Sequence, residues 1–236
     1  MLSDDVPRTT NVDAARWLSP LWESNPRPFP YHGNALPTEL RGRARGSKAP
    51  TSRRKKDSGE SLYRALGLQR VEPIIIRFAT KADAPAIAEI YNHEVENETS
   101  TFDLVPRSLD EQREWQAARS GAFAVIVAEI NGTVVGFGAL SPYKERAAYR
   151  ASVEDSIYVR RDMARQGIGQ ALLRHLITTA KDGGFHTVLA RIATDNTASI
   201  ALHQAMGFDV VGIEKQVGRK FNRWLDVMLL QLMLEN

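Results

Sequence analysis

The stretch VEDSIYVRRDMARQGIGQALL, residues 153–173, decides the fold of this chain. Val153, Ile157 and Val159 fall on one face of a period-two pattern, while Glu154, Ser156 and Tyr158 fall on the other, and this predicts a half-buried strand. Glu154 lies on the polar face of this strand. A charged turn follows, and Gly167 and Gly169 open a repeat of apolar residues at helical spacing. The chain therefore passes from a strand through a glycine-rich turn into a helix.

The glycine-rich turn is a candidate anion site. Such a turn exposes backbone N–H groups at the positive end of the helix dipole and has no side chains to keep a phosphate away. No Lys-Ser/Thr pair follows the glycines, which excludes a P-loop, and the GxG lacks the xxG of a dinucleotide-binding fingerprint. From these residues alone, ordinary turn chemistry and an anion site both stay open.

Charge is divided unevenly along the 236 residues. Residues 1–70 contain 13 Lys and Arg against 7 Asp and Glu, a net charge of +6, whereas residues 71–236 contain 18 against 21, a net charge of −3. A basic, proline-rich segment can bind nucleic acid or an anionic membrane, but scattered charge of this kind is typical of a solvated, disordered leader. We expect residues 1–70 to be such a leader and residues 71–236 to be the folded domain.

The leader shows no sustained periodicity, and only residues 61–68 predict a short helix. Its segment WESNPRPFPYHGNALPTELRGR is similar to peptides produced when a transfer-RNA gene is translated by mistake. We therefore expect that the true translation start lies close to Val71. A genuine disordered leader is the alternative.

The absence of cysteine excludes a disulfide framework, a thiolate metal site and a cysteine nucleophile. No apolar run approaches the roughly 18 residues of a membrane span. The N-terminus MLSDDVPRTT is acidic and lacks the apolar centre of a secretory signal. These features predict a cytoplasmic protein with no metal and no membrane partner.

Periodicity and turn signals over residues 71–236 predict the order β-α-α-β-β-β-α-β-α-β-β, a mixed sheet of the α+β class with helices packed on it. Asp83 is a candidate N-cap, Ser108 and Glu111 have capping-box spacing, and Asn131-Gly132 is a strong hairpin signal. The expected strands are residues 74–78, 122–130, 133–140, 153–159, 187–193, 210–217 and 224–234. The expected helices follow Asp83, begin at Ser108, run from Gly167 to the Gly183-Gly184 pair, and span residues 198–206.

This order and the glycine turn resemble the GCN5-related N-acetyltransferases (GNAT), and within them the phosphinothricin and methionine sulfoximine acetyltransferases. The resemblance covers about residues 74–234. Five blocks carry it in the right order: IYNHEVENETSTFD, VEDSIYV, RQGIGQALL, NTASIALHQAMGF and VGRKFNRWLDVMLLQLML. It implies a three-layer α+β GNAT fold, a mostly antiparallel mixed sheet with helices on both faces, and transfer of an acetyl group from acetyl-CoA to an amine.

The resemblance also implies where acetyl-CoA binds. The strand backbone would pair with the pantetheine amides like an added strand, and N–H groups of the turn would hold the pyrophosphate. Asn196 would contact pantetheine, although its position before a helix equally predicts an N-cap. The superfamily usually has Gln or Arg where this chain has Ala164, so we expect weaker cofactor binding rather than its loss. The implied cofactor-binding residues are Ile157, Tyr158, Val159, Arg165, Gln166, Gly167, Ile168, Gly169, Gln170 and Asn196.

Two residues are candidates for catalysis. The resemblance assigns Glu154 as general base, and a carboxylate in an apolar strand is expected to have a raised pKa. An exposed glutamate on an edge strand is the alternative. His203 would relay the proton or protonate the departing thiolate, while a satisfied core histidine is its alternative. Acyl transfer would be direct, with no covalent enzyme intermediate.

The expected acceptor is the α-amine of a small amino-acid analogue such as phosphinothricin or methionine sulfoximine. Phe102 would form a pocket wall, and Arg146, Tyr149 and Arg150 would bind a carboxylate or phosphinate, unless they belong to a solvated loop. Two alternatives stay open: another amine, such as a polyamine or a protein N-terminus, and a non-catalytic sensor associated with nucleic acid. The net negative charge of residues 71–236 argues against a nucleic-acid partner, and the resemblance implies a homodimer.

Overall fold

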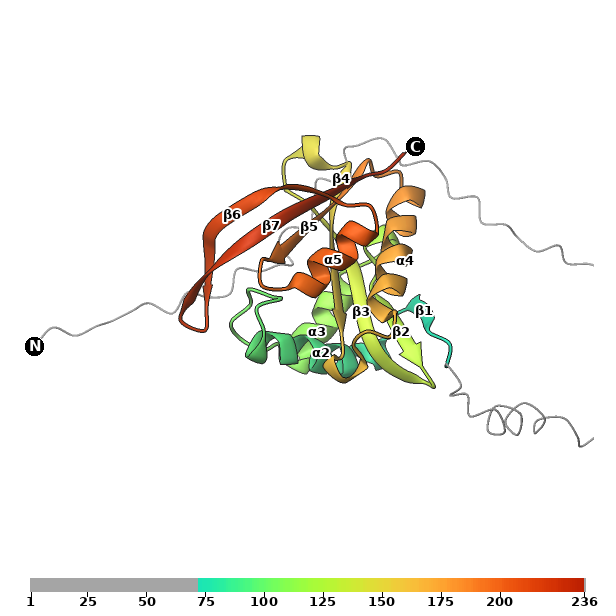
Figure 1. Cartoon of the computed structure of the whole chain (residues 1–236). Helices are drawn as coiled ribbons and strands as arrows, with labels where there is room; N and C mark the ends of the chain where they lie inside the picture. The colour runs from blue at the N-terminus through green and yellow to red at the C-terminus, as the bar shows by residue number, and fades with distance from the viewer. Residues whose placement is uncertain (1–71, 236) are drawn as a thin grey trace, which may run out of the picture. The chain divides into compact units, whose positions relative to one another are not determined.

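A single seven-stranded sheet organises the protein (Figure 1). The computed structural model describes residues 72–235, so the expected leader and its short helix lie outside the described residues. The order across the sheet is β1-β2-β3-β4-β5-β7-β6, and only β4 and β5 are parallel neighbours. The strands are β1 (Ile75–Phe78), β2 (Ile126–Ile130), β3 (Thr133–Pro142), β4 (Ser152–Val159), β5 (Thr187–Ala193), β6 (Asp209–Lys220) and β7 (Arg223–Met233).

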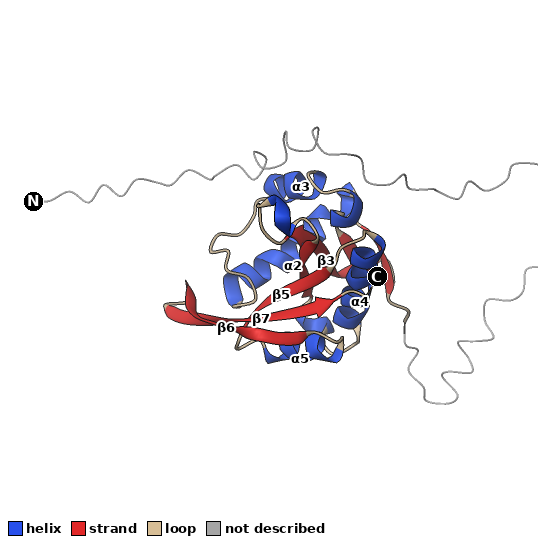
Figure 2. Cartoon of the chain, turned by 90° about the horizontal axis from the view of Figure 1, so that it is seen from above, coloured by secondary structure: helices blue, strands red, loops and turns tan. Residues whose placement is uncertain are grey.

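Helices cover both faces of the sheet (Figure 2). Helices α2 and α3 lie on one face, and α4 and α5 lie on the other. The helices are α2 (Ala84–Asn97), α3 (Leu109–Ala117), α4 (Ile168–Asp182) and α5 (Thr197–Ala205). The expected mixed, mostly antiparallel α+β fold with helices on both faces is confirmed.

Strand β4 shows how the alternating pattern divides the core. Val153 is fully buried on the α4 face, in the same cluster as Leu172 and Leu176. Tyr158 packs on the opposite face against the cluster that contains Tyr91 and Phe137. Alternate side chains of a strand point to opposite faces, so one strand contributes to two apolar layers. The prediction of a central strand with Glu154 and Tyr158 on one face is therefore confirmed.

Local sequence signals fixed several element ends. Ser108 and Glu111 form the predicted capping box, and Asn131 and Gly132 adopt φ of 51° and 78° in the predicted hairpin. Asp83 precedes α2, but its carboxylate accepts hydrogen bonds from Arg77 and Thr80 rather than capping the helix. The strand predicted from residue 122 begins later, at the first residue of β2, because Gly121–Phe123 forms a 3-10 turn.

The two parallel strands diverge, and this divergence positions the site. Strand β4 pairs with β5 only from Ser152 to Glu154, opposite Thr187 to Leu189. On its other edge, β4 stays paired with β3 as far as Val159. Beyond Glu154 the β5-facing backbone edge of β4 has no strand partner within residues 72–235. That edge is available to a bound molecule.

Candidate active site

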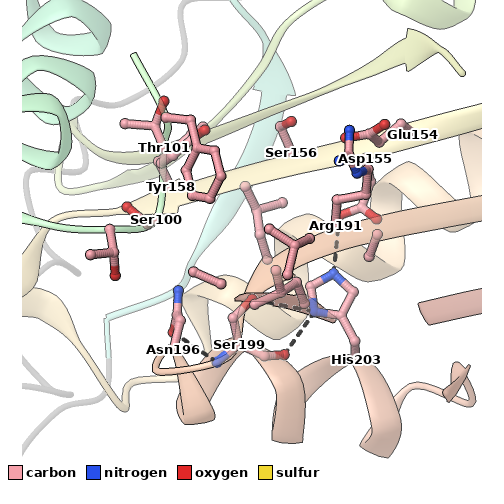
Figure 3. Close-up of a pocket in the computed structure, with 17 residues that line it drawn as sticks. Ser100, Thr101, Glu154, Asp155, Ser156, Tyr158, Arg191, Asn196, Ser199 and His203 are labelled. Atoms are coloured by element: carbon pink, nitrogen blue, oxygen red, sulfur yellow. Dashed lines mark hydrogen bonds and ion pairs between the residues drawn. The ribbon is translucent and has the colours of Figure 1, made fainter. Parts of the chain in front are cut away.

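A cavity of about 240 Å³ opens where β4 and β5 diverge (Figure 3). Its walls come from β4, β5, the start of α5 and the loop of residues 99–102. Residues from both faces of β4 line this one cavity, because β4 and β5 are no longer paired beyond Glu154. The sequence-predicted residues that line it are Phe102, Glu154, Ile157, Tyr158, Asn196 and His203.

Glu154 is half-buried in this cavity and has no hydrogen-bond partner in the described part of the chain. Burial raises the pKa of its carboxyl group above the usual value, because a carboxylate loses hydration there. The positive charge of Arg191 opposes this pKa shift, and the negative charges of Asp155 and Glu214 add to it. Arg191 itself pairs with Glu214 at 2.7 Å. The Glu154 carboxylate is thus free to exchange a proton with a molecule in the cavity.

His203 is deeply buried and has a protein partner on each ring nitrogen (Figure 3). Nδ1 lies 2.8 Å from the carbonyl oxygen of Ser199, and Nε2 lies 3.1 Å from Oδ2 of Asp155. Burial lowers the pKa of His203, but the hydrogen bond and charge of Asp155, with the Ser199 carbonyl, raise it overall. A carbonyl only accepts, so Nδ1 carries a hydrogen, and a cationic imidazole satisfies both contacts. Asp155 and His203 therefore form a buried ion pair between β4 and α5.

Asp155 was missed in the sequence, although a signal was present. It occupies the apolar face of β4, two residues from Val153 and two from Ile157, and this breaks the alternation. A carboxylate at such a position needs a buried partner. Oδ1 of Asp155 has no hydrogen-bond partner among residues 72–235, so its compensation comes from His203 alone.

The glycine turn follows β4 and begins α4. Arg165 and Gly167 have φ of 63° and 81°, in the left-handed region, and α4 starts at Ile168. A Cβ at Gly169 would come within 3.1 Å of the Leu202 side chain, so this glycine permits α4 and α5 to approach closely. The predicted residues 165–170 lie together at the N-terminus of α4, where N–H groups lack helical partners. Neither they nor Val159 line the 240 Å³ cavity.

Asn196 serves as the N-cap of α5, where its Oδ1 accepts a hydrogen bond from the Ser199 N–H at 3.2 Å. The capping alternative from the sequence is therefore confirmed. Because Asn196 also lines the cavity, a cofactor contact is compatible with capping.

The residues predicted to bind the acceptor are separated in this structure. Phe102 lines the cavity, and its ring covers Gly218 of β6 so closely that a Cβ there would come within 2.1 Å. Arg146, Tyr149 and Arg150 are exposed, in and beside the 3-10 turn Ala147–Tyr149, and none of them lines the cavity. Within one chain the structure does not bring them together with Phe102.

The loop of residues 99–102 is tied to distant elements by contacts that the sequence did not reveal. Glu94, a buried carboxylate of α2, accepts hydrogen bonds from Ser100 and from Arg161, whose Nε lies 2.8 Å away. The buried Lys220 ammonium of β6 donates to the carbonyl oxygen of Thr101 at 2.8 Å. One wall of the cavity is thus fixed by α2, β6 and the segment after β4.

Within residues 72–235, no group of three or more His, Asp or Glu side chains is arranged to hold a metal ion. None of the helices in this part of the chain is long and apolar enough to cross a membrane.

Comparisons with known proteins identify the family of the chain. A family model described as an acetyltransferase (GNAT) domain matches residues 76–229. The chain is 42% identical over 161 residues to the L-amino acid N-acyltransferase MnaT of Escherichia coli, covering 68% of this chain and 94% of that protein. It is 38% identical over 162 residues to the L-methionine sulfoximine/L-methionine sulfone acetyltransferase of Pseudomonas paraeruginosa, with the same coverage of 68% and 94%. A solved phosphinothricin acetyltransferase from Sinorhizobium meliloti, in complex with acetyl-CoA, is 37% identical with a TM-score of 0.66, covering 68% of this chain and 88% of that one.

Proposed function

Because the chain belongs to the GNAT family of acetyltransferases, we propose that it acetylates the α-amine of a small amino acid or analogue, such as methionine sulfoximine or phosphinothricin. It is an acetyl-CoA-dependent N-acetyltransferase. The acceptor class is supported by relatives named for L-amino acids, methionine sulfoximine and phosphinothricin, each 37–42% identical to this chain.

Two features of the chain fit acetyl-CoA. The β5-facing edge of β4 is unpaired beyond Glu154, so backbone groups of Ile157 and Val159 can pair with the pantetheine amides. The left-handed turn at Gly167 leaves the first N–H groups of α4 available for the pyrophosphate. When bound, acetyl-CoA supplies an acyl group already activated for transfer to an amine. An N–H group of the same strand edge can polarise the acyl carbonyl.

Glu154 would act as the general base. The observation that carries this proposal is a half-buried carboxylate, with a raised pKa and no hydrogen-bond partner within residues 72–235, at the point where β4 and β5 diverge. Above that pKa it is ionised and can take a proton from the acceptor's ammonium group, directly or through a water molecule. The free amine would then attack the acyl carbon, the C–S bond would break and coenzyme A would leave as its thiolate, without a covalent enzyme intermediate.

His203 would support this chemistry through position. Both of its ring nitrogens are engaged by Asp155 and Ser199, so the ion pair holds the start of α5 against β4. Asn196 lies at that start and faces the cavity. The earlier prediction of proton transfer by His203 itself stays a prediction, as do a homodimer and a cytoplasmic location.

Release of coenzyme A by the full chain tests the function. We expect turnover that requires methionine sulfoximine or phosphinothricin and falls by about 10²- to 10⁴-fold in Glu154→Gln, the usual range for loss of a general base. Glu89→Gln, at an exposed position on α2, is the matched control and should match the wild type. Turnover with a polyamine or a peptide N-terminus but with neither analogue would overturn the acceptor class. Unchanged turnover in Glu154→Gln would overturn the assignment of the base.

A further inference from the structure

A second cavity, of about 200 Å³, lies beside the first on the α2 and α3 face of the sheet. Ser156 and Tyr158 of β4 line both cavities, so the two spaces are neighbours. Two arginines and an aromatic wall that includes Trp115 complete the second cavity. None of the residues proposed for catalysis or for cofactor binding, apart from Tyr158, lines it.

Arg119 brings a positive charge to this cavity without a carboxylate partner among residues 72–235. Its guanidinium donates to the Leu140 carbonyl at 2.8 Å and to the Ser141 hydroxyl at 3.1 Å, and it lies 4.3 Å from the centroid of the Trp115 ring. Burial, and then the nearby charge of Arg107, lower its pKa to about 10. A half-buried cation without a counterion has lost part of its hydration, so an anion in the cavity would be stabilising.

Arg107 adds a second guanidinium, which stacks 3.9 Å from the centroid of the Tyr91 ring. Its ion pair, with Asp103, is long at 3.4 Å, and the Asp103 side chain is half exposed. The Tyr91 hydroxyl donates to the same Asp103 oxygen at 2.6 Å. The two guanidinium groups that line the cavity thus have one carboxylate partner between them, Asp103 on Arg107, and the lining of the cavity is net positive.

We propose that the second cavity binds the anionic side-chain group, a carboxylate or a phosphinate, of an acidic amino-acid acceptor whose α-amine faces Glu154. The inference rests on the proposed function and extends it to the choice of acceptor. Glu154, Ser156 and Tyr158 point to the same face of β4, and each step of two residues along a strand is about 6.6 Å. An acceptor of glutamate length spans one such step from its amine to its terminal acid group.

The proposed role of the second cavity can be distinguished by experiment from the role predicted for the exposed residues Arg146 and Arg150. Arg146 and Arg150 were expected to bind a carboxylate or a phosphinate, and the α-carboxylate is common to every amino-acid acceptor. The cavity with Arg107 and Arg119 would instead distinguish acceptors by the charge of their side chains. Loss of Arg146 should weaken all amino-acid acceptors alike, whereas loss of Arg119 should weaken only the acidic ones.

The test compares kcat/KM for phosphinothricin, whose side chain is anionic, with kcat/KM for methionine sulfone, whose side chain is neutral, in the full chain. We expect Arg119→Gln and Arg107→Gln to lower the value for phosphinothricin by about 10- to 100-fold, the worth of a charge-assisted hydrogen bond, and to change the value for methionine sulfone by less than about threefold. Arg119→Lys, which keeps the charge, should recover part of the loss. Arg113→Gln on the exposed side of α3 is the control and should leave both values unchanged.

Each outcome is decisive because both acceptors are measured on one preparation. Rates are expressed per folded enzyme, with the folded fraction of each variant measured by circular dichroism, so that partial unfolding is not counted as a loss of activity. Equal losses for the two acceptors, or no loss for phosphinothricin, would overturn the anionic cavity while leaving the proposed function in place. Wild-type protein that acetylates neither acceptor would contradict the proposed function itself, and the inference with it.

Discussion

Glu154 and Asp155 are adjacent carboxylates on one strand, and the fold gives them opposite surroundings. Glu154 points to the α2 face, is half-buried and has no hydrogen-bond partner in the described part of the chain. Asp155 points to the α5 face and is fixed in a buried ion pair with His203. One residue along a strand reverses the face, so neighbouring side chains of the same chemical type can serve different purposes.

The difference between the two carboxylates supports the proposal that Glu154 is the general base. The Asp155 carboxylate is engaged by Nε2 of His203 at 3.1 Å, so its role is to hold α5 against β4. The carboxylate beside it keeps its lone pairs free and has its pKa raised by burial. The chain thus separates a group that maintains structure from a group that can exchange protons.

The largest expected effect is on the free energy of unfolding, which should fall much more on loss of Asp155 than on loss of Glu154. Asp155→Ala leaves His203 buried without its counterion and should lower the free energy of unfolding by about 3 kcal/mol, the usual cost of breaking a buried pair. Glu154→Ala removes a group with no such partner and should cost much less. Urea unfolding of the two variants at pH 7 measures both values.

Asp155→Asn is the matched control for this comparison. Its amide can donate to Nε2 of a neutral imidazole, so part of the lost stability should return. Equal costs for Asp155→Ala and Glu154→Ala would show that the two carboxylates do not differ in the way we infer.

The next effect is on the pH dependence of activity. Because Glu154 must be ionised to accept a proton, kcat/KM should rise about tenfold per pH unit up to its pKa and then level off. Burial raises that pKa, and the charge of Asp155 contributes to the increase. Asp155→Asn should therefore move the rise in kcat/KM to lower pH. Steady-state rates between pH 4.5 and about 8 provide the profile. If the rise in kcat/KM persists in Glu154→Gln, or moves to higher pH in Asp155→Asn, it reports the ionisation of a different group.

The sequence predicted the features that depend on neighbouring residues. The capping box at Ser108, the hairpin at Asn131-Gly132 and the strand, turn and helix of residues 153–182 each follow from a few adjacent positions, and the structure contains all of them. Physical rules for turns, caps and periodicity act over this short range. The resemblance extended the prediction to the complete fold and to the family.

The contacts that shape the site could not be predicted, because they join residues far apart in the chain. Asp155 meets His203 across 48 positions, and Lys220 reaches Thr101 across 119. Their formation depends on how α5 and β6 pack on the sheet, which no local pattern specifies. Only Asp155 carried a signal of such a contact in the sequence, because it is a carboxylate on the apolar face of its strand. His203 was identified through the resemblance, but its partner was not.

The smallest expected effect concerns the charge on His203. It tests the buried ion pair from the side of the histidine, where the previous predictions changed Asp155. The hydrogen bond and charge of Asp155 raise the pKa of His203 in the folded protein, although burial opposes this. The folded state therefore binds the proton more tightly than the unfolded state, in which the pKa is about 6.5. The stability that this provides is complete below the unfolded pKa and is lost as the pH rises through the folded pKa.

The stability difference between wild type and His203→Gln should accordingly be largest near pH 5 and decrease towards pH 9. Urea unfolding at a series of pH values measures it, and Asp155→Asn should show the same trend because it removes the other half of the pair. The ring of Phe208 packs edge-on against His203 with the centroids 5.0 Å apart and carries no charge, so Asp155 is the partner that sets the direction. A stability difference that grows with pH would mean that His203 is buried as the neutral imidazole.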